Sequence, residues 1–419
     1  AGGNACGNGH CRPGRGLTMG RQRMTAEILI MNKRAVAMAA DSAVTTYVQG
    51  RPVVRNVGQK LFPLTANRPV GVMVFGNAEL SGRPWGHMVE RFHGLRPNAD
   101  WQTLEGAATD FANSLDGVED FFPASVQQES YRMMLMASYL AVLLSAGGDE
   151  PNAEQVSSTI ERVHAYLARM KDLPCFPAGF AQKVYKLYGG LIEETEKRFF
   201  SEYNLGEPAR AKLREIAALC VTKDAFLEGG IGMVTGAVFG GFGAKEQFPA
   251  MAAYQISGVV AGVAKRKLWQ QAKIEPLGSP LLIPYAQAHM AQAFIQGIDP
   301  ELKDFVVQLA ASAMVFTGDQ LVAEASDLPD PRKLELRRSL REKHVVHAAN
   351  LFYQKLQETI QNYYINPIMR VVGLSGEEEL GGIARSLVEL CAFRMRVAGE
   401  DQTVGGEVSA AIITRNGFS

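Results

Sequence analysis

Cysteine, net charge and long apolar runs are all scarce in this chain. Its 419 residues include only five scattered cysteines, too few for a disulfide framework, so we expect a reducing, cytoplasmic location. The 43 basic and 43 acidic side chains cancel, which argues against a dedicated nucleic-acid or anionic-membrane surface. The longest strongly apolar stretch, 133–146, is too short to cross a bilayer and predicts a buried helix.

Cofactor and metal motifs are also missing. The sequence has no Walker loop, G-x-S-x-G elbow or H-E-x-x-H pair, and the glycines at 240–243 lack the G-x-G-x-x-G spacing of a dinucleotide site. Cys6 and Cys11 have no second cluster to complete a four-ligand zinc site. His344 and His347 lie three residues apart without an evident acidic third ligand. We therefore predict no cofactor and no bound metal.

The first 24 residues differ in composition from the rest. They contain seven glycines, four arginines and no acidic residue, which predicts a disordered leader or a mis-called start. If translation starts at Met24, removal of that methionine exposes Thr25. The chain as a whole is 47% hydrophobic, enough for one large core or two ordinary ones.

Hydrophobic periodicity predicts alternating groups of strands and helices. Apolar runs at 26–31 and 35–40 flank a turn at Asn32-Lys33, which is typical of a β-hairpin. The order of strands, helices, strands, helices and a last strand suits a layered sandwich with sheets inside. The other expected segments are a strand pair at 60–64 and 70–75, helices within 85–223, glycine-rich strands within 231–263, helices within 285–364, an amphipathic helix around 380–391 and a strand at 408–414.

A few residues in this order resemble a known family. Thr25 opens the first apolar run, Asp41 follows in Ala-Ala-Asp-Ser, Lys60 starts a later strand and Gly76 ends the next. Asp401-x-x-Val-Gly-Gly precedes the last strand. This pattern resembles the proteasome β-subunits and their bacterial relatives, which are N-terminal nucleophile hydrolases. The resemblance implies an α+β fold, a four-layer αββα sandwich, in one domain over 25–419 with large helical insertions at about 85–225 and 285–370.

The resemblance assigns each of these residues a chemical role. Thr25 would be the nucleophile, with its free α-amine as the base, because that amine titrates near neutral pH. Lys60 would stabilise negative charge on the threonine oxygen, and Asp41 would pair with Lys60. Gly76 would donate its backbone N–H to the oxyanion, and Asp401 would orient the amine. The implied activity is hydrolysis of peptide or other amide bonds through an acyl-enzyme at Thr25.

The chain also departs from the family pattern. Val404 replaces a serine of the late turn, and Met24 replaces the glycine that usually precedes a self-cleaving threonine. The second departure indicates methionine removal rather than autoproteolysis. An alternative function is a catalytically inactive assembly or partner-binding protein that keeps the sandwich. For either function the resemblance implies a homo-oligomer, possibly a ring.

Overall fold

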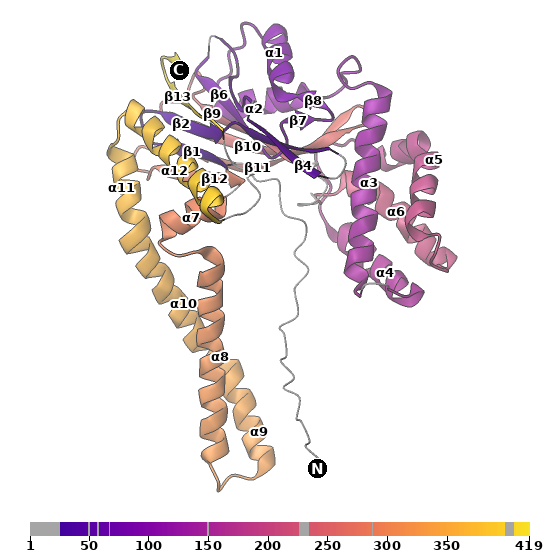
Figure 1. The fold of residues 1–419 in the computed structure, drawn as a ribbon, viewed down its shortest axis with the longest axis vertical. Coiled ribbons are helices and arrows are strands. Elements are labelled where there is room, and N and C mark those ends of the chain that lie inside the picture. Colours follow the sequence, from indigo (N-terminus) through magenta and orange to yellow (C-terminus); the bar gives the residue numbers. More distant parts are fainter. Residues whose placement is uncertain are drawn as a thin grey trace, which may run out of the picture.

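A computed structural model describes residues 26–48, 51–56, 58–66, 68–148, 151–225, 234–286, 288–398 and 406–419. Within them the chain forms a mixed α+β fold built on two five-stranded antiparallel sheets (Figure 1). Thr25 and Asp401 lie outside the described residues. The α+β class predicted from the sequence is therefore confirmed.

The first sheet contains three of the predicted strands. Its order is β12-β1-β2-β13-β14, with β1 paired antiparallel to β2 as the predicted hairpin. Strand β12 precedes the second helical region and was not expected. The bounds are β1 Ala26–Met31, β2 Val36–Asp41, β12 Leu281–Ala286, β13 Val408–Thr414 and β14 Gly417–Phe418.

The second sheet has the order β11-β10-β9-β6-β5. The β5–β6 pair and the glycine-rich strands β9 and β10 were predicted, whereas β11 was not. Two small two-stranded sheets, β3–β4 and β7–β8, lie outside it. The bounds are β3 Ala43–Val48, β4 Arg51–Asn56, β5 Leu61–Pro63, β6 Val70–Phe75, β7 Glu79–Leu80, β8 Arg83–Pro84, β9 Thr235–Gly241, β10 Ala250–Val260 and β11 Val263–Lys273.

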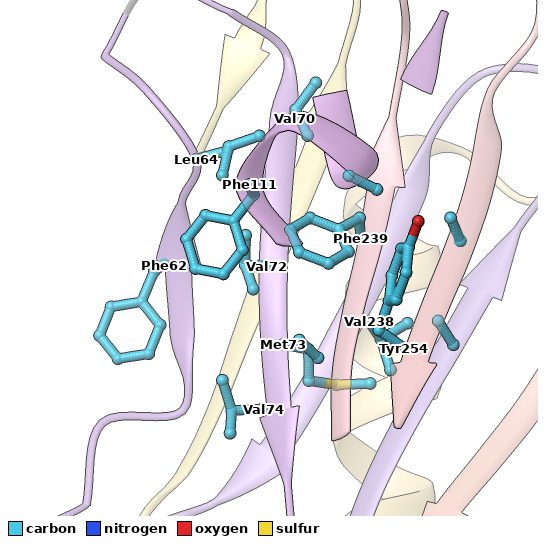
Figure 2. Close-up of a cluster of buried hydrophobic side chains, with 14 of the residues drawn as sticks. Phe62, Leu64, Val70, Val72, Met73, Val74, Phe111, Val238, Phe239 and Tyr254 are labelled. Atoms are coloured by element: carbon cyan, nitrogen blue, oxygen red, sulfur yellow. The ribbon is translucent and has the colours of Figure 1, made fainter. Parts of the chain in front are cut away.

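The two sheets pack face to face, and a glycine sets how closely they approach. A Cβ added at Gly240 in β9 would lie 2.6 Å from Met38 Cε and 2.9 Å from Val36 Cγ1, both in β2. A side chain at this position would force both residues to shift, so the close packing of the two sheets favours glycine here. On the opposite face of the second sheet, Phe111 lies against Val72 and Phe239 (Figure 2).

Helices cover both outer faces of the paired sheets. Helix α12 (Glu377–Ala398) packs on the first sheet through the predicted face of Leu380, Leu387 and neighbouring apolar residues. Helix α7 (Ala288–Gln296) joins it there. Helices α1 (Trp85–Leu95) and α2 (Leu104–Asn113) pack in the core beside the second sheet. The two sheets therefore bury the apolar faces of these helices.

Four helices form a lobe with a hydrophobic core of its own, beside the β10–β11 hairpin. They are α3 (Ala124–Ala146), α4 (Ala153–Arg169), α5 (Phe180–Phe200) and α6 (Glu207–Thr222). The run expected to be a buried helix falls in α3, which is buried on one face only. Leu140 and Leu144 of α3 are exposed.

A long helical arm projects from the first sheet's side of the molecule (Figure 1). It leaves through α8 and returns through α10, and α8 is only slightly buried along its length. By length and composition alone, α8 is the one helix among the described residues that could cross a membrane. The bounds are α8 Pro300–Glu324, α9 Asp330–Ser339, the π-helical η1 Leu340–Val345, α10 Val346–Ile360, the π-helical η2 Gln361–Ile365 and α11 Asn366–Leu374.

Candidate active site

A buried lysine lies between two carboxylates where the two sheets meet. Lys60 Nζ is 2.6 Å from Asp41 Oδ1 and 3.0 Å from Glu27 Oε1. The carboxylates are fully buried, and the lysine side chain is 5% exposed. Burying a charge is costly unless the charge is paired, and here each carboxylate contacts the lysine, so the pairing offsets the cost of burial.

Strand geometry brings the three residues together from separate segments. Asp41 ends β2, and Glu27 is the second residue of β1, which pairs antiparallel with β2. Lys60 immediately precedes β5 in the other sheet, where its C=O accepts a hydrogen bond from Val74 N–H at 2.9 Å. The ion pairs therefore join the two sheets at one end.

Asp41 also holds the backbone that follows Thr25. The Ala26 N–H donates to Asp41 Oδ1 at 3.2 Å, so this oxygen accepts from both Ala26 and Lys60. The Ala26 nitrogen is the atom to which Thr25 is covalently attached. The residue expected to be the nucleophile is thus covalently attached to a backbone nitrogen that donates a hydrogen bond to the cluster.

Glu27 is the member of the cluster that the sequence reasoning missed. It is the single charged residue in the otherwise apolar run 26–31. A carboxylate in a strand buried on both faces requires a cationic or hydrogen-bonding partner, so this interruption was the available signal. The structure supplies Lys60 as that partner.

Electrostatics keep Lys60 in its charged form. Burial by itself lowers the pKa of Lys60, but the adjacent carboxylates of Glu27 and Asp41 outweigh burial and raise the pKa above its ordinary value. Lys60 is therefore an ammonium at neutral pH. It can stabilise an anion, but it cannot act as the base that deprotonates a hydroxyl.

Gly76 lies at the same end of the second sheet. It follows β6 directly, two residues beyond the Val74 that bonds to Lys60. Its φ is +82°, and an added Cβ would lie 2.9 Å from the carbonyl oxygen of Val234. Both facts require glycine, because other residues rarely adopt this conformation and lack the space.

A cysteine near the cluster is chemically quiet. Cys391, on α12, is buried, and burial raises its pKa to about 11, with smaller contributions that include Asp41 and Glu27. A thiol held protonated at neutral pH is a weak nucleophile. This residue therefore packs the helix against the first sheet rather than competing for the reaction.

Three aromatic rings lie together near Glu27. Tyr285 pairs with Glu27 across β12 and β1, and its ring centroid is 5.1 Å from that of Phe75, the residue before Gly76. Trp269 completes the group at 6.0 Å from both rings and is 46% exposed. An apolar wall thus runs from the charged cluster toward solvent.

The structure thus brings together two of the five residues predicted from the sequence. Asp41 and Lys60 are in direct contact, and Gly76 lies at the same end of the paired sheets. Thr25 and Asp401 are outside the described residues. Val408, in the strand that follows the 401–405 segment, pairs with Asp41 in the first sheet.

One further group of possible metal ligands lies at the root of the arm. His289, Asp299 and Glu301 have ligand atoms within 4.8 Å of one another. Asp299 already accepts the N–H groups of Glu301 and Leu302 as the N-cap of α8. The group is partly exposed, and helix capping explains the position of its central carboxylate.

Comparison with known proteins adds no relative. No model of a known protein family matches the chain, and no curated protein matches its sequence.

Proposed function

We propose that this protein is an N-terminal threonine hydrolase that cleaves peptide or other amide bonds when Thr25 is the first residue. The observation that carries the proposal is the buried Lys60 held by Asp41, with the same Asp41 oxygen bonded to the amide nitrogen of Ala26. A fixed cation stabilises negative charge that develops on a nearby oxygen, which is what a threonine nucleophile attached to Ala26 would need.

The arrangement of layers supports the same proposal. Two five-stranded antiparallel sheets lie face to face, with α12 on one outer face and α2 on the other. We infer that this is the four-layer αββα sandwich of N-terminal nucleophile hydrolases. The charged cluster joins the two sheets of that sandwich where β1 begins, beside residue 25.

The chemistry follows from the protonation state of each group. The Thr25 hydroxyl oxygen attacks the substrate carbonyl carbon while the α-amine takes the hydroxyl proton. Because Lys60 stays protonated, it cannot take that proton and instead stabilises the oxygen. The Gly76 N–H donates to the tetrahedral oxyanion, and the amine returns its proton to the leaving nitrogen. Water then hydrolyses the threonine ester.

The proposal is tested with protein made to begin at Thr25, for example by cleaving a fused tag. Intact-mass spectrometry after incubation with an epoxyketone or β-lactone is expected to show one covalent adduct. The Thr25→Ala variant and protein retaining residues 1–24 are expected to show none.

The alternative of an inactive assembly protein also has a specific observation in its favour, namely the largely exposed apolar helix α8. It makes a distinct prediction. Protein beginning at Thr25 would assemble normally but would neither bind the probe nor hydrolyse peptides.

A further inference from the structure

Two buried side chains hold the turn that contains Gly76. The Thr235 hydroxyl, on β9, lies 2.9 Å from the carbonyl oxygens of both Phe75 and Asn77. The Trp85 indole N–H, on α1, donates to the Asn77 carbonyl and to the Thr235 oxygen, at 3.2 Å in each case. Thr235 and Trp85 are 1% and 2% exposed. These two side chains, called the Gly76 clamp below, therefore bind the carbonyls of both residues that flank Gly76.

The hydrogen bond from Thr235 fixes the direction of the Gly76 N–H. The C=O of Phe75 and the N–H of Gly76 belong to one peptide group, and the peptide bonds of the described residues are all trans. A trans peptide is planar, with its C=O and N–H pointing in opposite directions. Because Thr235 binds the Phe75 carbonyl on the β9 side of β6, the Gly76 N–H points to the other side, where β5 lies.

The pairing of β6 with β5 indicates the same direction. Val74, two residues before Gly76, donates its N–H to the Lys60 carbonyl at 2.9 Å. N–H groups two residues apart along a strand point to the same edge. The Gly76 N–H is therefore directed to the edge of β6 on which Lys60 and its ion cluster lie. This is the side on which the proposed reaction would form an oxyanion.

Without the Gly76 clamp, the peptide between Phe75 and Gly76 has another orientation open to it. The φ of Gly76 is +82°, and glycine adopts positive and negative φ about equally readily. Rotation of the peptide group would turn its N–H toward β9 and its C=O toward the ion cluster. The buried hydroxyl of Thr235 opposes this rotation, because the rotated state would leave the hydroxyl without its Phe75 partner.

The same hydrogen bonds polarise the Gly76 N–H. Trp85 donates to the Thr235 oxygen, and the Thr235 hydroxyl hydrogen is donated in turn to the Phe75 carbonyl. Hydrogen bonds in a buried chain polarise one another, by about 10–30% per bond. The chain ends at the N–H of the same peptide group, so it makes that N–H a better donor to negative charge.

We propose that Thr235 and Trp85 are positioning residues that hold the Phe75–Gly76 peptide with its N–H facing the oxyanion of the reacting amide. This role rests on the proposed hydrolase function, in which Gly76 is the oxyanion donor. The two side chains act through the backbone of residues 75–77 and do not themselves contact the substrate.

The first experiment observes the Phe75–Gly76 peptide by NMR and needs no substrate. The sequence contains three Phe–Gly bonds, which begin at Phe75, Phe239 and Phe242. Protein labelled with ¹³C at the phenylalanine carbonyls and ¹⁵N at glycine therefore gives three carbonyl–nitrogen correlations. The correlation that disappears in Phe75→Tyr belongs to the Phe75–Gly76 peptide. This correlation is expected to move in Thr235→Val, because the Phe75 carbonyl loses its donor, and to stay close to its wild-type position in Thr235→Ser.

The second experiment measures acylation by a β-lactone with protein that begins at Thr25. The rate constant at saturating lactone is expected to fall about 10–100-fold in Thr235→Val, since complete loss of an oxyanion donor costs about 10²–10³-fold. The half-saturating lactone concentration should stay unchanged, because the Gly76 clamp does not touch the ligand. Thr235→Ser keeps the hydroxyl and should restore most of the rate. Trp85→Phe removes only the indole N–H and should lower the rate by a smaller factor.

The matched control is Thr195→Val. Thr195 is also buried, and its hydroxyl donates to the Leu191 carbonyl at 2.7 Å within α5 of the helical lobe. The substitution removes a comparable buried hydrogen bond outside the turn of Gly76. It should leave both the Phe75–Gly76 correlation and the acylation rate unchanged.

The two experiments separate failure of the Gly76 clamp from failure of the proposed function. If the wild type reacts, an unchanged acylation rate in Thr235→Val overturns the positioning role. A rate that falls without movement of the Phe75–Gly76 correlation, or that falls equally in Thr195→Val, also overturns it. A wild type that does not react overturns the hydrolase function and the catalytic role of the Gly76 clamp with it. The NMR correlation then still shows whether Thr235 orients the peptide.

Discussion

Lys60 decides what the candidate site can do at the scale of single residues. It lies between two carboxylates, which keep it charged. A cation in this setting has a structural task and an electrostatic one. The structural task can be measured without any substrate.

Removing the cation is expected to leave two buried carboxylates without the ammonium group that lies between them. Lys60→Met should lower the free energy of unfolding by about 3–5 kcal/mol in urea titrations at pH 7. Lys33→Met is the control, because Lys33 lies exposed in the β1–β2 turn and should change stability by less than about 0.5 kcal/mol. Equal stability of the two variants would contradict the ion cluster.

Glu27 is expected to set the pH dependence of the reaction. Glu27→Gln removes one negative charge beside the Thr25 attachment point, which makes a protonated amine less favourable there. The acidic limb of the kcat/KM profile should therefore move to lower pH, by about one pH unit. An unmoved limb with reduced stability would restrict Glu27 to a structural role.

Whether a strand could be predicted from the sequence depended on how apolar it is. Strands β1, β2 and β13 are short and strongly apolar, so their residues alone predicted them. Strand β11 was missed because it contains Lys265, Arg266 and other charged residues, and such a segment is typical of an exposed surface. Arg266 is paired with Asp116, which lies 150 residues earlier, and no local pattern reveals such a partner.

Candidate-site residues divide in the same way. Asp41, Lys60 and Gly76 were predicted through the family resemblance. Glu27 is not part of that pattern, and its contact with Lys60, 33 residues away, appears only in the fold. The exposure of α8 was also hidden. Its composition suits a core helix, and only the fold shows which face is left uncovered.

The turn after β6 is expected to tolerate no side chain. Gly76→Ala should destabilise the protein by about 3 kcal/mol and slow hydrolysis about 100-fold, because a Cβ would meet Val234 O and displace the oxyanion donor. Gly82 has a similar φ of +74° but no atom within 4 Å of an added Cβ. Gly82→Ala should therefore cost about 1 kcal/mol and leave the rate unchanged. Equal hydrolysis rates for Gly76→Ala and Gly82→Ala would contradict a role for Gly76 as the oxyanion donor.

Lys265 links β11 to the helical lobe and should make stability depend on pH. Its Nζ donates to the Cys220 carbonyl at 2.7 Å, and burial lowers its pKa from 10.5 to about 8. Between these values the unfolded chain binds more protons than the folded one, so stability rises with pH. From pH 7.5 to 9.5 the wild type should gain about 2 kcal/mol relative to Lys265→Met in urea titrations. A constant difference would contradict a neutral lysine in the fold.

Three regions are separate at the scale of the whole molecule. The charged cluster joins the two sheets at one end, the α3–α6 lobe has its own core, and the arm projects away from both (Figure 1). A defect in the arm should therefore leave the ion cluster unaltered. This separation lets the hydrolase proposal and the assembly alternative be tested independently.

The most direct measurement is the intact mass of protein beginning at Thr25 after treatment with an epoxyketone or β-lactone. The account predicts one adduct per chain, located at Thr25, and none in Thr25→Ala or in protein that retains residues 1–24. An unmodified mass from folded protein that begins at Thr25, or an adduct that persists in Thr25→Ala, would contradict it.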